Sequence, residues 1–162
     1  MGTLRILSRA PVGTGTPALA FRRLLGTMLA MASLGTATLF AGLPEREIRE
    51  ITQKFDERRH PAGWEIVAGG AAGAGFMVVG EGQLEVVLPD GRTRELGPGD
   101  AFGEMALLDK ERRSASVRAR TDVTIYWLPA WEFKPFLVAH PEVSYRLLEQ
   151  LSRRVRRAEG AG

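Results

Sequence analysis

The stretch FGEMALLDKERRSASVRA, residues 102–119, decides how the chain is interpreted. FGEMALL is too short for a full helix and is typical of a single helical turn, whose first N–H groups favour an anion. Gly103 lets the backbone approach a ligand closely, and Arg113 can return across the loop to pair with a phosphate. Glu104 would repel that phosphate, so we expect it to face hydroxyl donors, which a sugar supplies. The stretch therefore predicts a site for a sugar and a phosphate together.

Short segments rich in β-branched and aromatic residues surround this stretch. Gly-rich or Asp-Gly turns, such as the one at residues 89–91, separate them. Several short strands at close spacing predict an all-β sandwich, roll or barrel. The predicted strands are residues 64–68, 76–79, 83–88, 92–96, 114–119 and 123–128.

Helical patterns flank the strands on both sides. PEREIREITQKF, residues 44–55, has acids in its first turn and places Ile48, Ile51 and Phe55 on one face. Helical spacing returns from Trp131 to about residue 139 and again over residues 141–158. A break at His140-Pro141 separates these two helices, because a residue before proline avoids the helical region.

Composition limits the class of protein. With 162 residues, 44% hydrophobic and 25% charged, the chain fits one globular domain. The absence of cysteine excludes disulfides, thiolate zinc sites and cysteine nucleophiles. The net charge is +3, but residues 1–44 carry +4 and no acid, so the remaining 118 residues carry 3 − 4 = −1. Nucleic-acid binding driven by charge is therefore not supported for the folded part.

Residues 1–37 are expected to be an N-terminal extension that is disordered or outside the native domain, and residues 38–159 to be the domain. Residues 24–43 have the length of a membrane span, but seven of these twenty residues are Gly, Ser or Thr, so we expect no span. A secretory signal with a cleavage site near residues 30–32 and a transit peptide are alternatives. Whether residues 1–32 are a leader, a tail or outside the native chain stays open.

The stretch at 102–119 resembles the phosphate-binding cassette of the cyclic-nucleotide-binding domain family. The resemblance rests on Phe102-Gly103-Glu104, Ala106-Leu107 and the run from Arg113 to Ala119, and it covers roughly residues 38–158. It implies a fold that is mainly β with flanking helices: an antiparallel β-roll (double-stranded β-helix, or jelly roll) with a short N-terminal helix and two C-terminal helices.

The resemblance also implies a ligand and roles for individual residues. Glu104 would accept a hydrogen bond from the ribose 2′-hydroxyl and would need no counter-ion, while Arg113 would pair with the cyclic phosphate. A hydroxyl at Ser114 suits cyclic AMP and cyclic GMP alike, so both stay open. The expected ligand-binding residues are Phe102, Gly103, Glu104, Met105, Ala106, Arg113, Ser114, Ala115 and Ser116.

Two departures from the family pattern stand out. The loop between the first strands has glycines and alanines at residues 69–75 where many members carry acids. The segment that would cover the base, residues 156–159, has no threonine and serine pair, and no helix-turn-helix follows for reading DNA.

The last predicted helix, residues 141–158, carries an apolar stripe at heptad-like spacing that favours a homodimer. The stripe comprises Ser144, Leu148, Leu151, Val155 and Ala158. The alternative is that the same stripe packs on the β-roll of its own chain. The arginines at 153, 154, 156 and 157 are expected to form a solvated face.

We find no catalytic residues, no metal site and no cofactor site in the sequence, and we expect a binding protein rather than an enzyme. Two function classes remain. The first is a stand-alone cytoplasmic sensor that binds cyclic AMP or cyclic GMP and signals to an effector protein by helix movement or assembly. The second is a degenerate form of the same fold that serves as a structural or protein-interaction module. The presence of both Glu104 and Arg113 favours the sensor.

Overall fold

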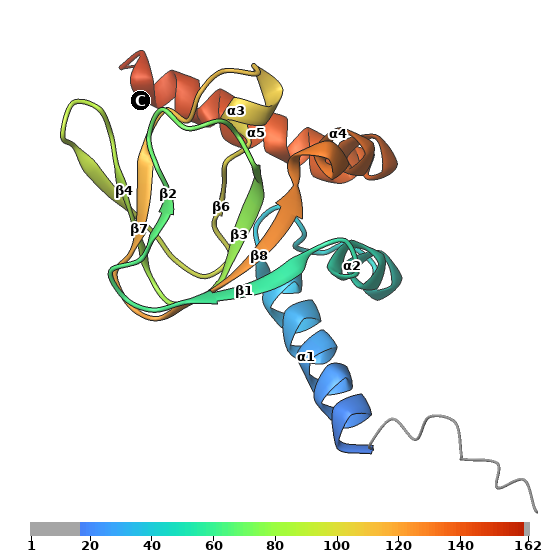
Figure 1. The fold of residues 1–162 in the computed structure, drawn as a ribbon. Helices are drawn as coiled ribbons and strands as arrows, with labels where there is room; N and C mark the ends of the chain where they lie inside the picture. The colour runs from blue at the N-terminus through green and yellow to red at the C-terminus, as the bar shows by residue number, and fades with distance from the viewer. Residues whose placement is uncertain (1–16, 161–162) are drawn as a thin grey trace, which may run out of the picture.

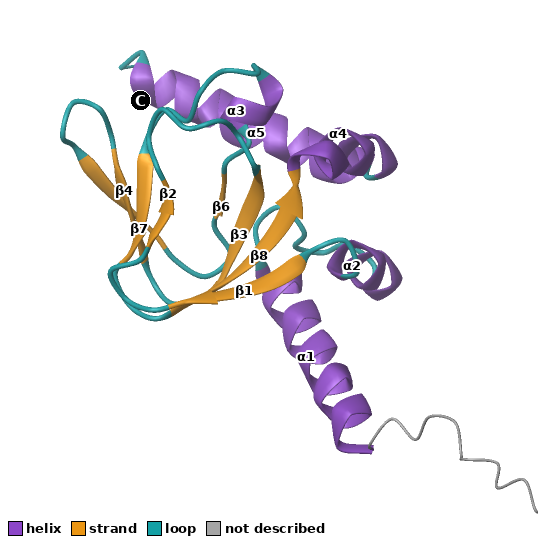
Figure 2. Cartoon of the chain, in the orientation of Figure 1, coloured by secondary structure: helices purple, strands orange, loops and turns teal. Residues whose placement is uncertain are grey.

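The computed structural model of the protein describes residues 17–160. Its strands form two four-stranded sheets in which every pairing is antiparallel (Figures 1 and 2). The first sheet has the order β1 (Asp56–His60), β8 (Val123–Pro129), β3 (Gly75–Glu81) and β6 (Ala101–Phe102). The second has the order β2 (Glu65–Val67), β7 (Ser116–Ala119), β4 (Leu84–Val87) and β5 (Thr93–Leu96). The predicted antiparallel jelly roll is thus confirmed.

Alternation along the strands divides the hydrophobic core into two parts. Successive side chains of a strand point to opposite faces of its sheet. Met77 and Val79 of β3 accordingly pack inside the roll, with apolar residues of both sheets. Phe76 and Val78 point to the other face and join a second cluster under the helices. The central strands β3 and β8 of the first sheet are therefore buried on both faces.

Between residues 17 and 160, five helices accompany the roll. They are α1 (Pro17–Thr36), α2 (Glu45–Thr52), α3 (Met105–Leu108), α4 (Ala130–Ala139) and α5 (Pro141–Ala158). The α4 and α5 boundaries agree with the predicted break at His140, and α2 buries Ile48 and Ile51 as its pattern predicted. Phe55, which follows α2, packs edge to face against Phe76 of β3, with ring centres 6.2 Å apart, and against Phe136 of α4, at 5.7 Å.

The expected boundary at residue 38 differs from the structure. The helix α1 begins at Pro17, and its C-terminal end buries Ala30 and Leu34 in the helical cluster together with Ala37. Burial of apolar surface is what places these residues in the domain. The N-terminal half of α1 projects away from the roll (Figure 1). Residues 1–16, the rest of the expected extension, lie outside the described residues.

The sequence analysis also missed the edge strand β1. Its residues DERRH are polar and largely exposed, and the strand is held by backbone pairing along β8 from Asp56 opposite Trp127 to His60 opposite Val123. Between residues 17 and 160, none of the helices combines the length and apolar character needed to cross a membrane. Within the same range, no three His, Asp or Glu side chains are grouped so that they could hold a metal ion.

Candidate functional site

The single helical turn predicted at residues 102–108 is α3, which follows directly on β6. Between them Gly103 has a φ of +89°, a left-handed conformation that side chains rarely adopt. This conformation turns the chain sharply, so that Glu104 points inward and is only 2% exposed. The glycine is thus needed for the local backbone geometry that buries the carboxylate.

Arg113 reaches the same turn from the far end of the loop, as predicted. Its guanidinium donates to the carbonyl oxygens of Gly103, at 2.7 Å, and of Gly75 on β3, at 2.6 Å. A Cβ on Gly103 would lie 2.6 Å from the Arg113 Nη1 atom, so the arginine needs this glycine beside it. Arg113 is 7% exposed, and burial lowers its pKa while the nearby carboxylate of Glu104 opposes that shift.

Glu104 has a cationic partner that the sequence analysis did not predict. Arg154, on the fourth turn of α5, forms an ion pair with the Oε1 atom of Glu104, which corrects the expectation that Glu104 needs no counter-ion. The Arg154 side chain is 31% exposed, whereas its neighbour Arg153 is 68% exposed and only approaches Glu149. The expected solvated face of arginines is therefore wrong for Arg154. The pair attaches α5 directly to the α3 turn.

A pocket opens between the α3 turn, the second sheet and α5. Three arginines and one acid line it, which gives a lining charge of 3 − 1 = +2. The third cation is Arg94 of β5, whose pKa is lowered by burial and by the nearby charge of Arg154. A low-dielectric pocket with excess positive charge favours an anionic ligand. The pocket is lined by Val67, Val86, Arg94, Phe102, Gly103, Glu104, Met105, Ala106, Arg113, Ser114, Ala115, Val117 and Arg154.

Eight of the nine predicted ligand-binding residues line this pocket. They are Phe102, Gly103, Glu104, Met105, Ala106, Arg113, Ser114 and Ala115. Ser116 lies outside it, because its hydroxyl points to the β2–β3 loop and accepts a hydrogen bond from the N–H of Gly69 at 2.9 Å. Ser116 therefore fastens that loop to β7, and Ser114 is the hydroxyl that faces the pocket.

The charged pocket residues that sequence reasoning missed are Arg94 and Arg154. Arg154 follows Leu147 and Leu151 at spacings of seven and three residues, so it lies on the face of α5 that packs against the core. That spacing is the signal that separates Arg154 from the exposed arginines around it. Arg94 lies within a strand of mainly exposed residues, and we find no signal in the sequence that distinguishes it.

The loop of glycines and alanines, residues 69–75, forms the wall behind Arg113. The Gly70 N–H donates to the Arg113 carbonyl and the Arg113 N–H donates to the Ala71 carbonyl, both near 2.9 Å. A second cavity lies on this side, between the loop and β1, and Arg113 lines both cavities. Because the loop has no acid, backbone carbonyls alone accept the hydrogen bonds of Arg113 that tie it to β3 and the turn.

Residues 57–140 match the family model described as the cyclic nucleotide-binding domain. The chain belongs to this family. The domain is a regulatory, non-catalytic fold, and the match spans the roll, the α3 turn and the loop that carries Arg113.

Solved structures and curated relatives agree with the family. The catabolite activator protein of Thermus thermophilus is 33% identical, with a TM-score of 0.69 over 75% of this chain and 59% of that one. A cyclic nucleotide-gated potassium channel of Rhizobium etli is 37% identical over 65% of this chain and 30% of its own length. A CRP-like cAMP-activated global transcriptional regulator of Mycobacterium tuberculosis is 30% identical over 76% of this chain and 58% of its own length. The chain thus spans less than two thirds of each of these relatives.

Proposed function

We propose that the pocket binds cyclic AMP or cyclic GMP and that the domain acts as a sensor of that ligand. Arg113 pairs with the cyclic phosphate, and the carboxylate of Glu104 accepts a hydrogen bond from the ribose 2′-hydroxyl. Both groups line one pocket whose excess charge suits a monoanion. Two of the relatives carry cyclic nucleotide or cAMP in their names, which supports the same ligand class.

One observation carries the proposal: among residues 17–160, no carboxylate forms an ion pair with the buried Arg113. Its guanidinium donates hydrogen bonds to two carbonyl oxygens, and the nearby acid Glu104 is already paired with Arg154. Burying a cation in this way is costly unless an anion compensates it. A phosphate that fills the pocket supplies that anion, whereas a purely structural module has no need of the buried charge.

The ion pair between Arg154 and Glu104 gives the bound ligand a route to α5. Arg154 attaches α5 to the carboxylate of Glu104. A ribose hydroxyl that donates a hydrogen bond to the same carboxylate alters its interaction with Arg154, so the position of α5 depends on the ligand. Such coupling requires that the ligand binds one arrangement of α5 better than the other. On the outer side of α5, Tyr145, Leu148 and Val155 are 54–63% exposed, and we propose that they form the seam of a homodimer. Because the proposed ligand is a second messenger, we propose that the sensor acts in the cytoplasm and signals to an effector protein there.

Thermal unfolding in the presence of nucleotides tests the proposal. At a concentration of one hundred times its Kd, a ligand stabilises the folded state by about 2.7 kcal/mol. We expect cyclic AMP or cyclic GMP to raise the melting temperature of the parent protein, and 5′-AMP, which has an open phosphate, to have a much smaller effect. If neither cyclic nucleotide shifts the transition at millimolar concentration, the alternative of a structural or protein-interaction module is favoured instead.

A further inference from the structure

The exposed half of α1 carries a continuous apolar stripe. Phe21, Leu24, Leu25, Met28 and Leu29 are each between 46% and 61% exposed. Their spacings of three, one, three and one residues place all five on one face of the helix. Scattered exposed apolar residues are ordinary on a protein surface, but five large ones on one helical face indicate a binding surface.

The same helix is anchored to the roll by its opposite face. Ala30 and Leu34 are buried, and Ser33 lies close enough to the buried Tyr126 to affect the pKa of its hydroxyl. At about 100° per residue, Ala30 and Leu34 lie on the side of α1 away from the stripe. The anchor therefore fixes α1 with the stripe exposed. Figure 1 shows that the N-terminal half of α1 projects from the roll.

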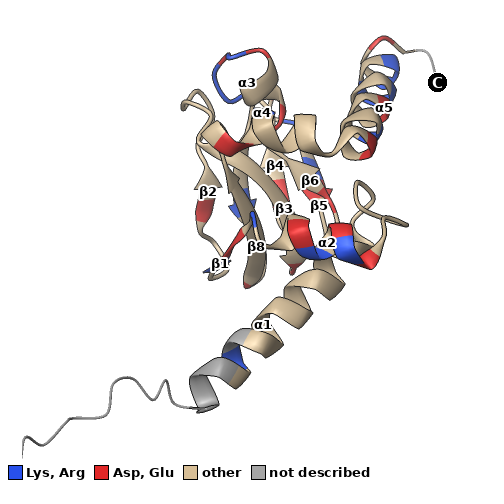
Figure 3. Ribbon diagram, turned by 90° about the vertical axis from the view of Figure 1, so that its right-hand side faces the viewer, with Lys and Arg blue, Asp and Glu red and all other residues tan. Residues whose placement is uncertain are grey.

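Charge distinguishes α1 from the other helices of eight or more residues. The helices α2, α4 and α5 each have an acidic residue in the first turn, whereas α1 has no acid at all. Figure 3 accordingly shows no red on α1 and a basic residue near its beginning. In the sequence, residues 1–44 contain four arginines and no acid, so the segment that includes the stripe has a net charge of +4.

We propose that α1 docks on the surface of an anionic lipid bilayer. The apolar stripe enters the boundary between headgroups and acyl chains, and Arg22, which is exposed beside it, contacts lipid phosphates. An apolar face combined with basic residues is the pattern of helices that lie in a membrane interface rather than cross it. Pairing with a second copy of α1 would also bury the apolar stripe. It would, however, bring the arginines of the two copies together and would supply no anion for them.

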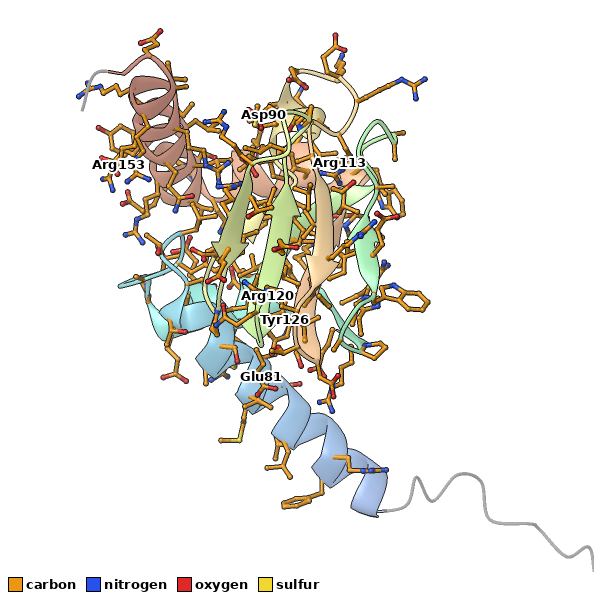
Figure 4. All side chains as sticks on the ribbon, turned by 90° about the vertical axis from the view of Figure 1, so that its left-hand side faces the viewer. Glu81, Asp90, Arg113, Arg120, Tyr126 and Arg153 are labelled. Carbon is orange, nitrogen blue, oxygen red and sulfur yellow. The ribbon has the colours of Figure 1, made fainter. Side chains whose placement is uncertain are left out.

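The geometry of the domain is compatible with such docking. The projecting half of α1 and the α3 turn lie at opposite ends of the molecule, as Figures 1 and 3 both show. Figure 4 likewise places Tyr126 near α1 and Arg113 at the far end of the sheets. A bilayer that binds the stripe therefore leaves the nucleotide pocket open to solvent. This proposal does not depend on which ligand the pocket binds.

Vesicle co-sedimentation of the full chain tests the inference. The probes are vesicles of phosphatidylcholine alone and vesicles in which about a third of the lipid is phosphatidylglycerol. We expect sedimentation with the anionic vesicles, less at high salt because screening weakens the charge contribution, and little with phosphatidylcholine alone. Replacing Leu24, Leu25 and Met28 by glutamate is expected to lower the partition coefficient by at least about a hundredfold.

The control is Val138→Glu, which changes an equally exposed apolar residue on α4. We expect this variant to sediment like the parent, and both variants to unfold at the parental temperature, since none of the changed residues is buried. Three results would overturn the proposal: no binding to anionic vesicles, binding that survives the triple substitution, or binding that Val138→Glu also abolishes. A dimer that the triple substitution dissociates, without any vesicle binding, would assign the stripe to a second copy of the chain.

Discussion

Replacing Arg154 by alanine leaves the carboxylate of Glu104 buried without its counter-ion. Glu104 has a side chain that is 3% exposed, and removing one partner of a fully buried pair typically costs about 3–5 kcal/mol. The Arg154 side chain is 31% exposed, so water screens part of the interaction and the expected loss falls to about 2 kcal/mol. With an unfolding entropy of about 0.3 kcal/mol/K for a domain of this size, the melting temperature falls by about 7 °C.

Urea unfolding of Arg154→Ala, Glu104→Gln and the double variant measures this loss and assigns it to the pair. The double variant is expected to lose less stability than the sum of the single variants, because the neutral amide does not need a counter-ion. Arg153→Ala is the matched control, since Arg153 is exposed on the same turn, and we expect it to change stability by less than about 0.5 kcal/mol. Equal small losses for Arg153→Ala and Arg154→Ala, or strict additivity in the double variant, would refute the reasoning.

Three further predictions concern the turn, the sheet and the first helix. Gly103→Ala places a Cβ 2.6 Å from the Arg113 guanidinium at a φ of +89°, so we expect a loss of about 2–3 kcal/mol in urea unfolding, and parental stability would contradict it. Burial raises the pKa of Tyr126, so its stabilising contribution is complete below the ordinary value of 10.0 and is lost as the pH rises through the higher value in the folded state. Between pH 8 and 11 the melting temperature should therefore decrease less steeply with pH for Tyr126→Phe than for the parent. An equal decrease for both proteins would contradict this. Leu34→Ala should cost about 2–5 kcal/mol and the exposed Phe21→Ala almost nothing; equal effects would mean that α1 is not part of the domain.

Elements with a clear apolar pattern could be predicted from the sequence. Strands such as β3 and β8 combine β-branched and aromatic residues with buried positions, and α5 was predicted with its observed bounds because Pro141 and the helical spacing mark them. The edge strand β1 could not be predicted, because its polar residues are held by backbone pairing to β8 and carry no apolar signal. Strand formation there depends on a partner that is distant in sequence.

The site shows the same division between local and distant information. Glu104 and Arg113 belong to one contiguous stretch, and the glycine that turns the chain stands directly before the acid, so their roles follow from local spacing. Arg154 lies fifty residues beyond Glu104, and its sequence neighbours are exposed arginines. Leu151, three residues before Arg154, packs against the core, so its position identifies the buried face of α5 and places Arg154 on that face. The predicted apolar stripe of α5 mixed these faces, since Leu151 packs against the core of its own chain while Leu148 is exposed.

The most direct test of the central claim is calorimetric titration of the protein with cyclic AMP and with cyclic GMP. The titration is repeated on Arg113→Ala, on Arg113→Lys, and on Arg112→Ala, which removes the exposed neighbouring arginine. We expect the parent and Arg112→Ala to bind one of the two nucleotides, and Arg113→Ala to bind at least about a hundredfold more weakly, which corresponds to about 2.7 kcal/mol. The affinity of Arg113→Lys should lie between those of the parent and of Arg113→Ala, because lysine keeps the positive charge but cannot form a bidentate pair with the phosphate. Equal affinity of the parent and a folded Arg113→Ala, or no heat from the folded parent with either nucleotide, would contradict the assignment of this pocket.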